Sequence, residues 1–354
     1  MIFLLVCFFV CVYLYICENK SSRSFFKQMI VWLPAFFIYT IVPSFQYETG
    51  TDYSTYYNYF FNNDHYSYIE RNELLYYYLV EFVKLIGDPQ FQFILISLIQ
   101  GFLFFYILFL LKIIGFKSWL VFLIFFLSTG MYNNQMNLLR QYICIYFFII
   151  NFILIYKSSY MAVGFNSILS FLMHASSIIP NTLLVFINYF RIKNKKILLY
   201  VFLTSFFFWS VDYSSIISDF LNAYNFRYSL YLETEYSEGR AVDGILTKFY
   251  FLPIIVIFWY FYIKDKNVDN FFSFAILIFS LTHFMFLQAL SFDLLMRVWD
   301  YFIFFIIFPI YYVLNRSRGF TLILILIYIL LFYVLKVVFF PVAEYDYDFY
   351  MGWF

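Results

Sequence analysis

Residues 133–156 read NNQMNLLRQYICIYFFIINFILIY, part of an apolar run from Ser118 to Lys157 that is interrupted by one arginine, Arg140. A helix needs about 20 apolar residues to cross a bilayer, so this run predicts a membrane helix. A guanidinium stays charged at any workable pH. Holding it near hydrocarbon costs roughly 2.5–3.5 kcal/mol. The arginine therefore needs either a partner or a place at the membrane interface.

Polar residues surround Arg140 at the spacing of one helix face, namely Asn133, Asn137, Gln141 and Cys144. We favour the interpretation that this face forms an anion-binding site at the mouth of a membrane cavity, with Asn137 and Gln141 beside Arg140. The alternative is an arginine at a helix end whose side chain reaches the outer interface.

The composition predicts an all-α, polytopic membrane bundle. The chain is 64% hydrophobic and 12% charged, and its mean hydropathy is +0.81, which lies outside the range of soluble domains. Spans in lipid must satisfy their own backbone hydrogen bonds, which favours helices. The net charge of +1 gives no argument for nucleic-acid binding. We expect one integral membrane domain over residues 1–354, and we expect the apolar start of the chain to be a retained anchor.

Apolar runs divide the chain into about 11–12 expected transmembrane helices. Pro180 removes a backbone donor and disrupts a helix, so 161–190 is either two spans or one re-entrant hairpin. The runs are 2–17, 29–45, 91–111, 118–132, 141–156, 161–174, 175–190, 197–212, 245–263, 271–290, 298–314 and 320–339.

Most Lys and Arg residues fall in one set of short loops, which the positive-inside rule assigns to the cytoplasm. We therefore expect a multi-pass inner-membrane protein with both termini on the periplasmic side. The long segments 46–90 and 213–244 and the tail 340–354 then also lie outside. Within the first of these segments we expect an amphipathic helix at the outer interface. Its polar stripe is Glu73, Tyr77, Glu81, Lys84 and Asp88.

Two outer regions hold groups that could act as a base. The first outer loop, YETGTDYSTYYNYFF at 47–61, places Glu48 and Asp52 on either side of a turn at Gly50. A carboxylate there could accept a proton from a sugar hydroxyl, with tyrosine rings against the sugar. The alternative is an ordinary solvated loop with interfacial tyrosines.

The second region is His174. It shares a predicted helix face with polar residues, and a partly buried neutral imidazole can serve as a base. The alternative is a histidine that only makes hydrogen bonds. The other residues of that face are Ser167, Ser170, Ser177 and Asn181.

Further arginines occur in the other outer segments: Arg227, Arg240 and Arg297. Guanidinium groups match phosphate oxygens in pairs, so arginines from separate segments could clamp a diphosphate together with Arg140. For Arg297 the alternative is a local ion network with Asp293 and Asp300. The spacing of the histidines and cysteines predicts no metal site. The chain contains no P-loop, dinucleotide-binding or nucleophile-elbow motif, so we expect no cofactor.

Four segments resemble the EpsG-like group of Wzy-type polysaccharide polymerases: GTDYSTYYNYF at 50–60, MNLLRQYI at 136–143, HASSIIP at 174–180 and RVWDYF at 297–302. The resemblance implies a metal-independent glycosyltransferase that polymerises oligosaccharide repeat units linked to undecaprenyl diphosphate. The growing glycan would pass to the nonreducing sugar of a new unit at the outer membrane face. The hypothesis is that Arg140 and Arg297, helped by Arg227 or Arg240, hold the diphosphate. His174, Asp52 or Glu48 would then accept the proton, with Asp52 preferred over Glu48.

Other functions remain open. A related glycosyl transfer, by an O-antigen ligase or another enzyme acting on lipid-phosphate sugars, fits the same residues. A repeat-unit flippase would suit the number of spans, but the chain has no internal repeat and its long loops gather on one side. A membrane acyltransferase built around His174 is a further alternative. The sugars, the linkage, a protein that regulates chain length and the oligomeric state are not defined by the sequence. Neither is the choice between O-antigen and capsule or exopolysaccharide.

Overall fold

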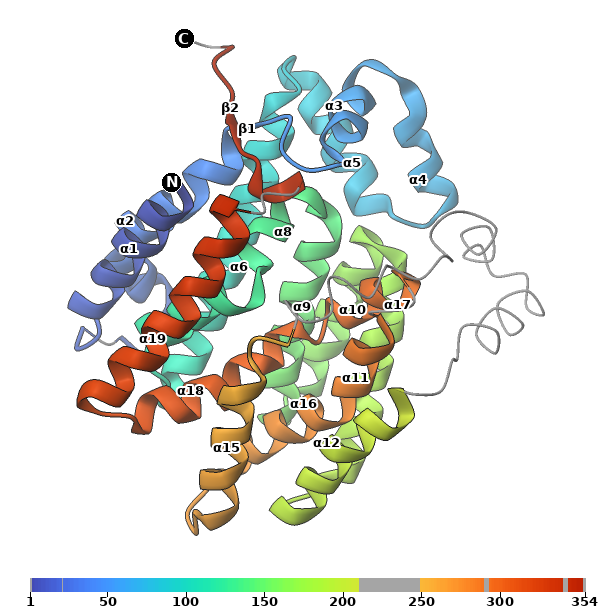
Figure 1. Ribbon diagram of the computed structural model, residues 1–354. Helices are drawn as coiled ribbons and strands as arrows, with labels where there is room; N and C mark the ends of the chain where they lie inside the picture. The colour runs from blue at the N-terminus through green and yellow to red at the C-terminus, as the bar shows by residue number, and fades with distance from the viewer. Residues whose placement is uncertain (1, 21, 210–248, 290–292, 340–342, 353–354) are drawn as a thin grey trace. The chain divides into compact units, whose positions relative to one another are not determined.

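The computed structural model describes residues 2–20, 22–209, 249–289, 293–339 and 343–352 (Figure 1). Within these residues the elements are helices and one short pair of strands, as expected for an all-α polytopic membrane protein. The chain divides into two compact units, and each is described by itself. Unit 1 comprises Met1–Leu184 and Leu326–Phe354, and unit 2 comprises Val185–Ile325. The expectation of a single integral domain stays a prediction.

Unit 1 begins with α1 (Ile2–Ile16) and α2 (Phe25–Ser44), which lead into the short segments that follow the second helix. These are β1 (Gln46–Tyr47), α3 (Tyr53–Phe61), a 3-10 turn (Asn63–Tyr66), α4 (Ser67–Glu70) and α5 (Leu74–Ile86). The central helices follow: α6 (Gln90–Ile114), α7 (Ser118–Ile124) with a π-helical turn (Phe125–Thr129), α8 (Met131–Asn137), α9 (Leu139–Tyr156) and α10 (Tyr160–Met173). The C-terminal end adds a π-helical turn (Leu335–Phe339), a 3-10 turn (Ala343–Tyr345) and β2 (Asp348–Phe349).

Two helices cross the boundary between the units. They are α11 (Ile178–Phe190), which follows a 3-10 turn (Ala175–Ser177), and α19 (Gly319–Val334). Unit 2 otherwise contains α12 (Lys195–Trp209), α15 (Leu252–Lys264), α16 (Asn270–Ala289), α17 (Asp293–Trp299), a 3-10 turn (Ile303–Ile306) and α18 (Ile307–Arg316).

Among the described residues, five helical stretches are long and apolar enough to cross a membrane: Phe25–Ser44, Gln90–Ile114, Leu139–Tyr156, Asn270–Leu287 and Gly319–Phe339. Other predicted spans form shorter apolar helices, including α1, α10, α11 and α15. The expected total of spans stays a prediction. So does the choice between two spans and a hairpin for 161–190.

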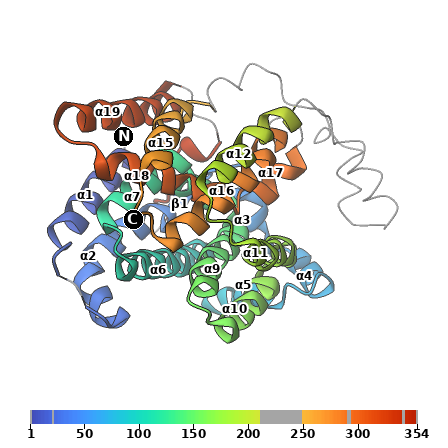
Figure 2. The same cartoon turned by 90° about the horizontal axis from the view of Figure 1, so that it is seen from below.

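Helices α2 and α6 pack side by side and run in opposite directions (Figures 1 and 2). Gly101 permits the close approach, since a Cβ built on it would lie 2.4 Å from Thr40 Cγ2. At one end of the pair, Lys112 Nζ donates to the carbonyl oxygen of Glu18 at 2.8 Å. At the other end, Gln90 Nε2 donates to the carbonyl oxygen of Ser44 at 2.8 Å. Loops predicted to be cytoplasmic thus meet at the end of unit 1 that lies away from segment 46–90.

The predicted continuous helix through Asn133 and Cys144 is wrong, because the chain breaks at Leu138 (φ −94°, ψ 56°). The break deprives the last carbonyls of α8 of their helical donors. Buried glutamines replace these donors: Gln100 Nε2 donates to Gln135 O at 3.3 Å, and Gln46 Nε2 donates to Met136 O at 3.1 Å. A helix end can lie in an apolar interior when side chains satisfy it in this way. Arg140 consequently lies in the first turn of α9.

The predicted polar face around His174 is also broken. Helix α10 ends at Met173, and His174 is extended (φ −157°, ψ 110°). Pro180 occupies the first turn of α11, where its missing N–H has no helical partner to lose. A break was therefore predicted correctly, but it lies several residues before the proline. His174 is a corner residue and not part of a helix face.

The C-terminal tail pairs with the start of segment 46–90. Strand β2 runs antiparallel to β1, with Gln46 opposite Phe349 and Tyr47 opposite Asp348. The Tyr350 N–H donates to the carbonyl oxygen of Phe45 at 2.8 Å, and the rings of Phe45 and Phe349 stack at 5.3 Å. The tail and the first long segment therefore lie at the same end of unit 1 (Figure 1).

Candidate active site

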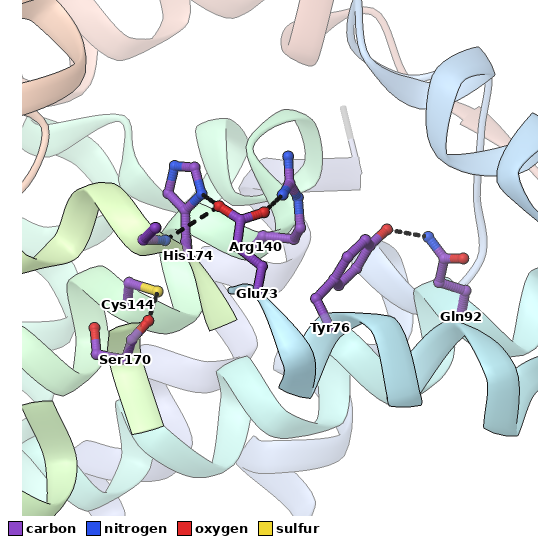
Figure 3. Close-up of polar contacts among 8 residues, drawn as sticks. Glu73, Tyr76, Gln92, Arg140, Cys144, Ser170 and His174 are labelled. Carbon is purple, nitrogen blue, oxygen red and sulfur yellow. Dashed lines mark hydrogen bonds and ion pairs between the residues drawn. The ribbon is translucent and has the colours of Figure 1, made fainter. Parts of the chain in front are cut away.

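Three segments of unit 1 bring Glu73, Arg140 and His174 into direct contact (Figure 3). Arg140 Nη1 donates to Glu73 Oε2. His174 Nδ1 lies 2.8 Å from Glu73 Oε1, and the backbone N–H of Ala175 donates to the same oxygen at 3.1 Å. The relative exposure of the side chains is 4% for Glu73, 14% for Arg140 and 18% for His174. One buried carboxylate thus joins the two residues that the sequence singled out.

Local backbone structure places each of the three side chains. Glu73 is the N-cap of α5 and follows Asn72, which has a positive φ of 60°. The break at Leu138 starts α9 immediately before Arg140, and the end of α10 turns His174 out of the helix. All three residues therefore lie at ends of helices, where the chain changes direction.

The environment keeps the Glu73 carboxyl ionised. Burial alone raises the pKa of this group, because a charge is disfavoured away from water. The hydrogen bond with His174, the charge of Arg140 and the Ala175 N–H oppose burial, and together they lower the pKa of Glu73 below its ordinary value. An ionised carboxylate can only accept hydrogen bonds, so His174 Nδ1 carries the hydrogen that points to Glu73.

Tyrosines from segment 46–90 line the site around Arg140. The guanidinium carbon of Arg140 lies 4.4 Å from the ring centroid of Tyr68, 4.9 Å from that of Tyr76 and 6.0 Å from that of Tyr56. The guanidinium carbon of Arg71 lies 5.1 Å from the same Tyr68 centroid. Cation–π contacts of this kind hold a guanidinium against an aromatic face. Two positive groups thus share one tyrosine.

Asn137 holds the loop at 47–61 next to Arg140. Its Oδ1 accepts the backbone N–H of Asp52 at 2.9 Å and the hydroxyl of Thr51 at 3.3 Å. Gly50 has a φ of +83°, and a Cβ built on it would lie 2.8 Å from that oxygen. The structure therefore gives Asn137 a structural contact in this loop, and its predicted role in substrate binding stays untested. Asp52 is partly buried, whereas Glu48 is exposed and has a positive φ of 48°.

The remaining predicted residues lie elsewhere or are not described. Gln141 is buried in the first turn of α9, next to Arg140 in the chain. Arg297 is an exposed residue of α17 and belongs to unit 2. Arg227 and Arg240 lie outside the described residues. That Arg140 and Arg297 hold one diphosphate stays a prediction. No group of three potential metal ligands occurs among the residues that the structure describes.

Two members of this site, Glu73 and Arg71, are not predicted from the sequence pattern. Both lie in ERNE, residues 70–73, which directly precedes the observed helix α5. Glu73 was assigned to a polar interfacial stripe. The useful indication would have been that a buried arginine needs an acidic partner. An acid at a helix start inside a tyrosine-rich segment was a candidate for that partner.

Comparisons with known proteins identify a family. The chain matches the EpsG family over residues 29–350. No curated protein and no solved structure matches it. The matched range contains all three residues of the cluster and the segments on which the resemblance rested. This chain is therefore a member of the EpsG family, the family of Wzy-like polysaccharide polymerases.

Proposed function

We propose that this protein polymerises oligosaccharide repeat units carried on undecaprenyl diphosphate, at the outer face of the inner membrane. Family membership supports a polysaccharide-polymerase role. The observation that carries the proposal is the convergence of Glu73, Arg140 and His174 from three separate segments. The cluster lies at the end of unit 1 that also holds the tyrosine-rich loop, where a glycan and a lipid headgroup can meet.

The proposed reaction is a single glycosyl transfer. A hydroxyl oxygen of the nonreducing sugar on the incoming unit attacks the anomeric carbon of the growing chain. The bond from that carbon to the diphosphate oxygen breaks, and undecaprenyl diphosphate leaves with the electron pair. The hydroxyl proton passes to a base, for which His174 is our first choice, because Glu73 orients its ring. Asp52 and the exposed Glu48 are the alternatives.

Positive charge near the leaving diphosphate would stabilise the transition state, an effect that is often the largest in catalysis. Arg140 and Arg71 are the guanidinium groups on Tyr68. Arg140 is paired with Glu73, whereas the Arg71 guanidinium lies against the Tyr68 ring and its buried Nε has no hydrogen-bond partner among the described residues. We therefore add Arg71 to Arg140, Arg297, Arg227 and Arg240 as a candidate for binding the diphosphate.

The test uses the purified full-length protein in lipid nanodiscs and a synthetic diphosphate-linked repeat unit. We expect a ladder of products that differ by one repeat unit, and no ladder from the His174→Gln variant. A protein that transfers the repeat unit only once, to a different acceptor, would instead support ligase activity. Absence of any transfer by the folded wild-type protein would reject the proposal.

A further inference from the structure

Glu73 contacts two groups with different chemistry, the imidazole of His174, which can act as a base, and the guanidinium of Arg140, which is a permanent cation. Its Oε1 faces His174 Nδ1 and its Oε2 faces Arg140 Nη1 (Figure 3). Glu73 has a relative exposure of 3%, and at least three donors surround its carboxylate. Helix periodicity cannot predict this link, because Glu73 lies 67 residues from Arg140 and 101 residues from His174.

The link defines which atom of His174 can exchange a proton. With Nδ1 donating to the carboxylate, the lone pair of the neutral ring lies on Nε2. Figure 3 shows this nitrogen on the side of the ring that points away from Glu73. An imidazolium formed by protonation of Nε2 keeps its hydrogen bond to Glu73, and the negative carboxylate stabilises it. Acid groups orient catalytic histidines in this manner in other enzymes.

The link also sets the charge of the cluster. With His174 neutral, the positive Arg140 and the negative Glu73 cancel. When His174 gains a proton, the cluster carries a net charge of one positive unit. The charged and titratable groups next to the cluster do not change this difference, because a proton that moves to His174 leaves their own charges unaltered. Among the described residues these neighbours include Arg71, Asp52, Tyr56, Tyr59, Tyr68, Tyr76 and Cys144.

We infer that Glu73 is a positioning residue that couples two events: His174 accepts the acceptor's proton, and the cluster becomes positive while the diphosphate leaves. This inference rests on the proposed function. Arg140 in this scheme holds Glu73 and supplies the charge that the proton transfer unmasks. If these three residues were positive throughout, they would stabilise the bound diphosphate before the reaction as much as in the transition state, which lowers KM without raising kcat. The cancellation of the Arg140 charge by Glu73, while His174 is neutral, avoids this stabilisation of the ground state.

The first experiment compares wild-type protein with Glu73→Gln in the nanodisc assay. Glutamine keeps the size and one acceptor oxygen but removes the negative charge. We expect kcat to fall by about 10²–10⁴-fold, the usual contribution of proton transfer. We expect the KM for the diphosphate-linked donor to stay equal or fall, because Arg140 is no longer neutralised. The acidic limb of the kcat/KM profile should shift to lower pH, because the imidazolium loses its carboxylate partner. Glu73→Asp should restore part of the rate.

Helix α5, which begins directly after Glu73, also contains a matched control residue, Glu81. Glu81 Oε1 lies 2.5 Å from the Nε2 of another histidine, His65, which makes a second Glu–His pair on α5. The Glu81→Gln variant changes charge in the same way, but its pair lacks an arginine. We expect its kcat and its acidic limb to equal those of the wild type. Equal effects of Glu73→Gln and Glu81→Gln would overturn the inference.

A second measurement decides the matter if Glu73→Gln does not fold. Binding of undecaprenyl diphosphate to nanodiscs is followed as the pH falls, for wild type and for His174→Gln. As the pH falls, we expect the affinity of the wild type to rise by about tenfold more than that of the variant. Because the lipid titrates equally in both samples, the difference between the two proteins reports the protonation of His174 alone. The same pH dependence in both proteins would overturn the inference. Failure of the wild-type protein to form a ladder would instead reject the proposed function.

Discussion

The ion pair between Glu73 and Arg140 should dominate the stability of unit 1 around the site. Breaking a buried pair by removing one partner costs about 3–5 kcal/mol, because the other charge stays buried. Arg140→Met leaves Glu73, which is 3% exposed, with a hydrogen bond to the Ala175 N–H and a contact with His174 but no permanent positive charge. The variant also loses contacts with three tyrosine rings, each worth roughly 0.5–2 kcal/mol.

The double variant Arg140→Met/Glu73→Leu separates charge from packing. Both charges disappear together, so most of the loss should be recovered. The Ala175 N–H then has no acceptor, which leaves a residual penalty of about 1–3 kcal/mol. We therefore expect the single variants to be less stable than the double variant by roughly 2 kcal/mol or more. None of the three should polymerise repeat units.

Thermal unfolding in detergent, followed by circular dichroism, measures the effect. One kcal/mol shifts Tm by about 2–4 °C in a unit of this size, so the single variants should melt roughly 6–20 °C below the wild type. Glu81→Gln serves as the control, because the Glu81 side chain is 38% exposed and its loss should shift Tm little. Two results would refute this reasoning. One is a decrease in Tm of the double variant that equals the sum of the decreases of the two single variants. The other is a Tm of each single variant that equals that of the wild type.

Three further results are expected. Gly50→Ala should lower stability by about 1–2 kcal/mol in the same melting assay, because the residue has a positive φ and contacts Asn137; an unchanged Tm would contradict this. Gln100→Leu should lower stability by about 1–3 kcal/mol, since the carbonyl of Gln135 loses its donor. Ser97→Ala on the same helix is the control, because the buried Ser97 hydroxyl has no hydrogen-bond partner among the described residues, and its stability should be nearly unchanged. The pKa of Glu73 is lowered, so its stabilising contribution is present above the ordinary carboxyl pKa and is lost as the pH falls through the lowered value; the Tm difference between wild type and Glu73→Gln should therefore shrink in acid, and a constant difference would count against the ion pair.

The helical membrane class was predictable because it depends on length and apolarity, which a sequence states directly. Arg140 and His174 stood out for a related reason, since a polar group in an apolar run is unusual. The breaks at Leu138 and His174 were harder to predict, because neither residue is glycine or proline. The break at Leu138 depends on donors from Gln46 and Gln100, which lie far away in the chain.

The composition of the cluster could be predicted only in part. Periodicity groups residues on one helix, and it placed Asn137 and Gln141 with Arg140. It cannot find a partner that lies 67 residues away, as Glu73 does. Nor does periodicity show the contact that Asn137 makes, since its side-chain oxygen accepts the backbone N–H of Asp52, 85 residues away.

The pairing of β1 with β2 has a consequence for biogenesis. Gln46 leaves the ribosome about three hundred residues before its partner Phe349, and at 5–20 residues per second the delay is roughly 15–60 s. During that interval the tyrosine-rich loop has its Asn137 anchor but not its strand partner. The end of unit 1 that holds this loop is thus completed only after Phe349 has been made, and nascent chains that lack Asp348 and Phe349 should be inactive.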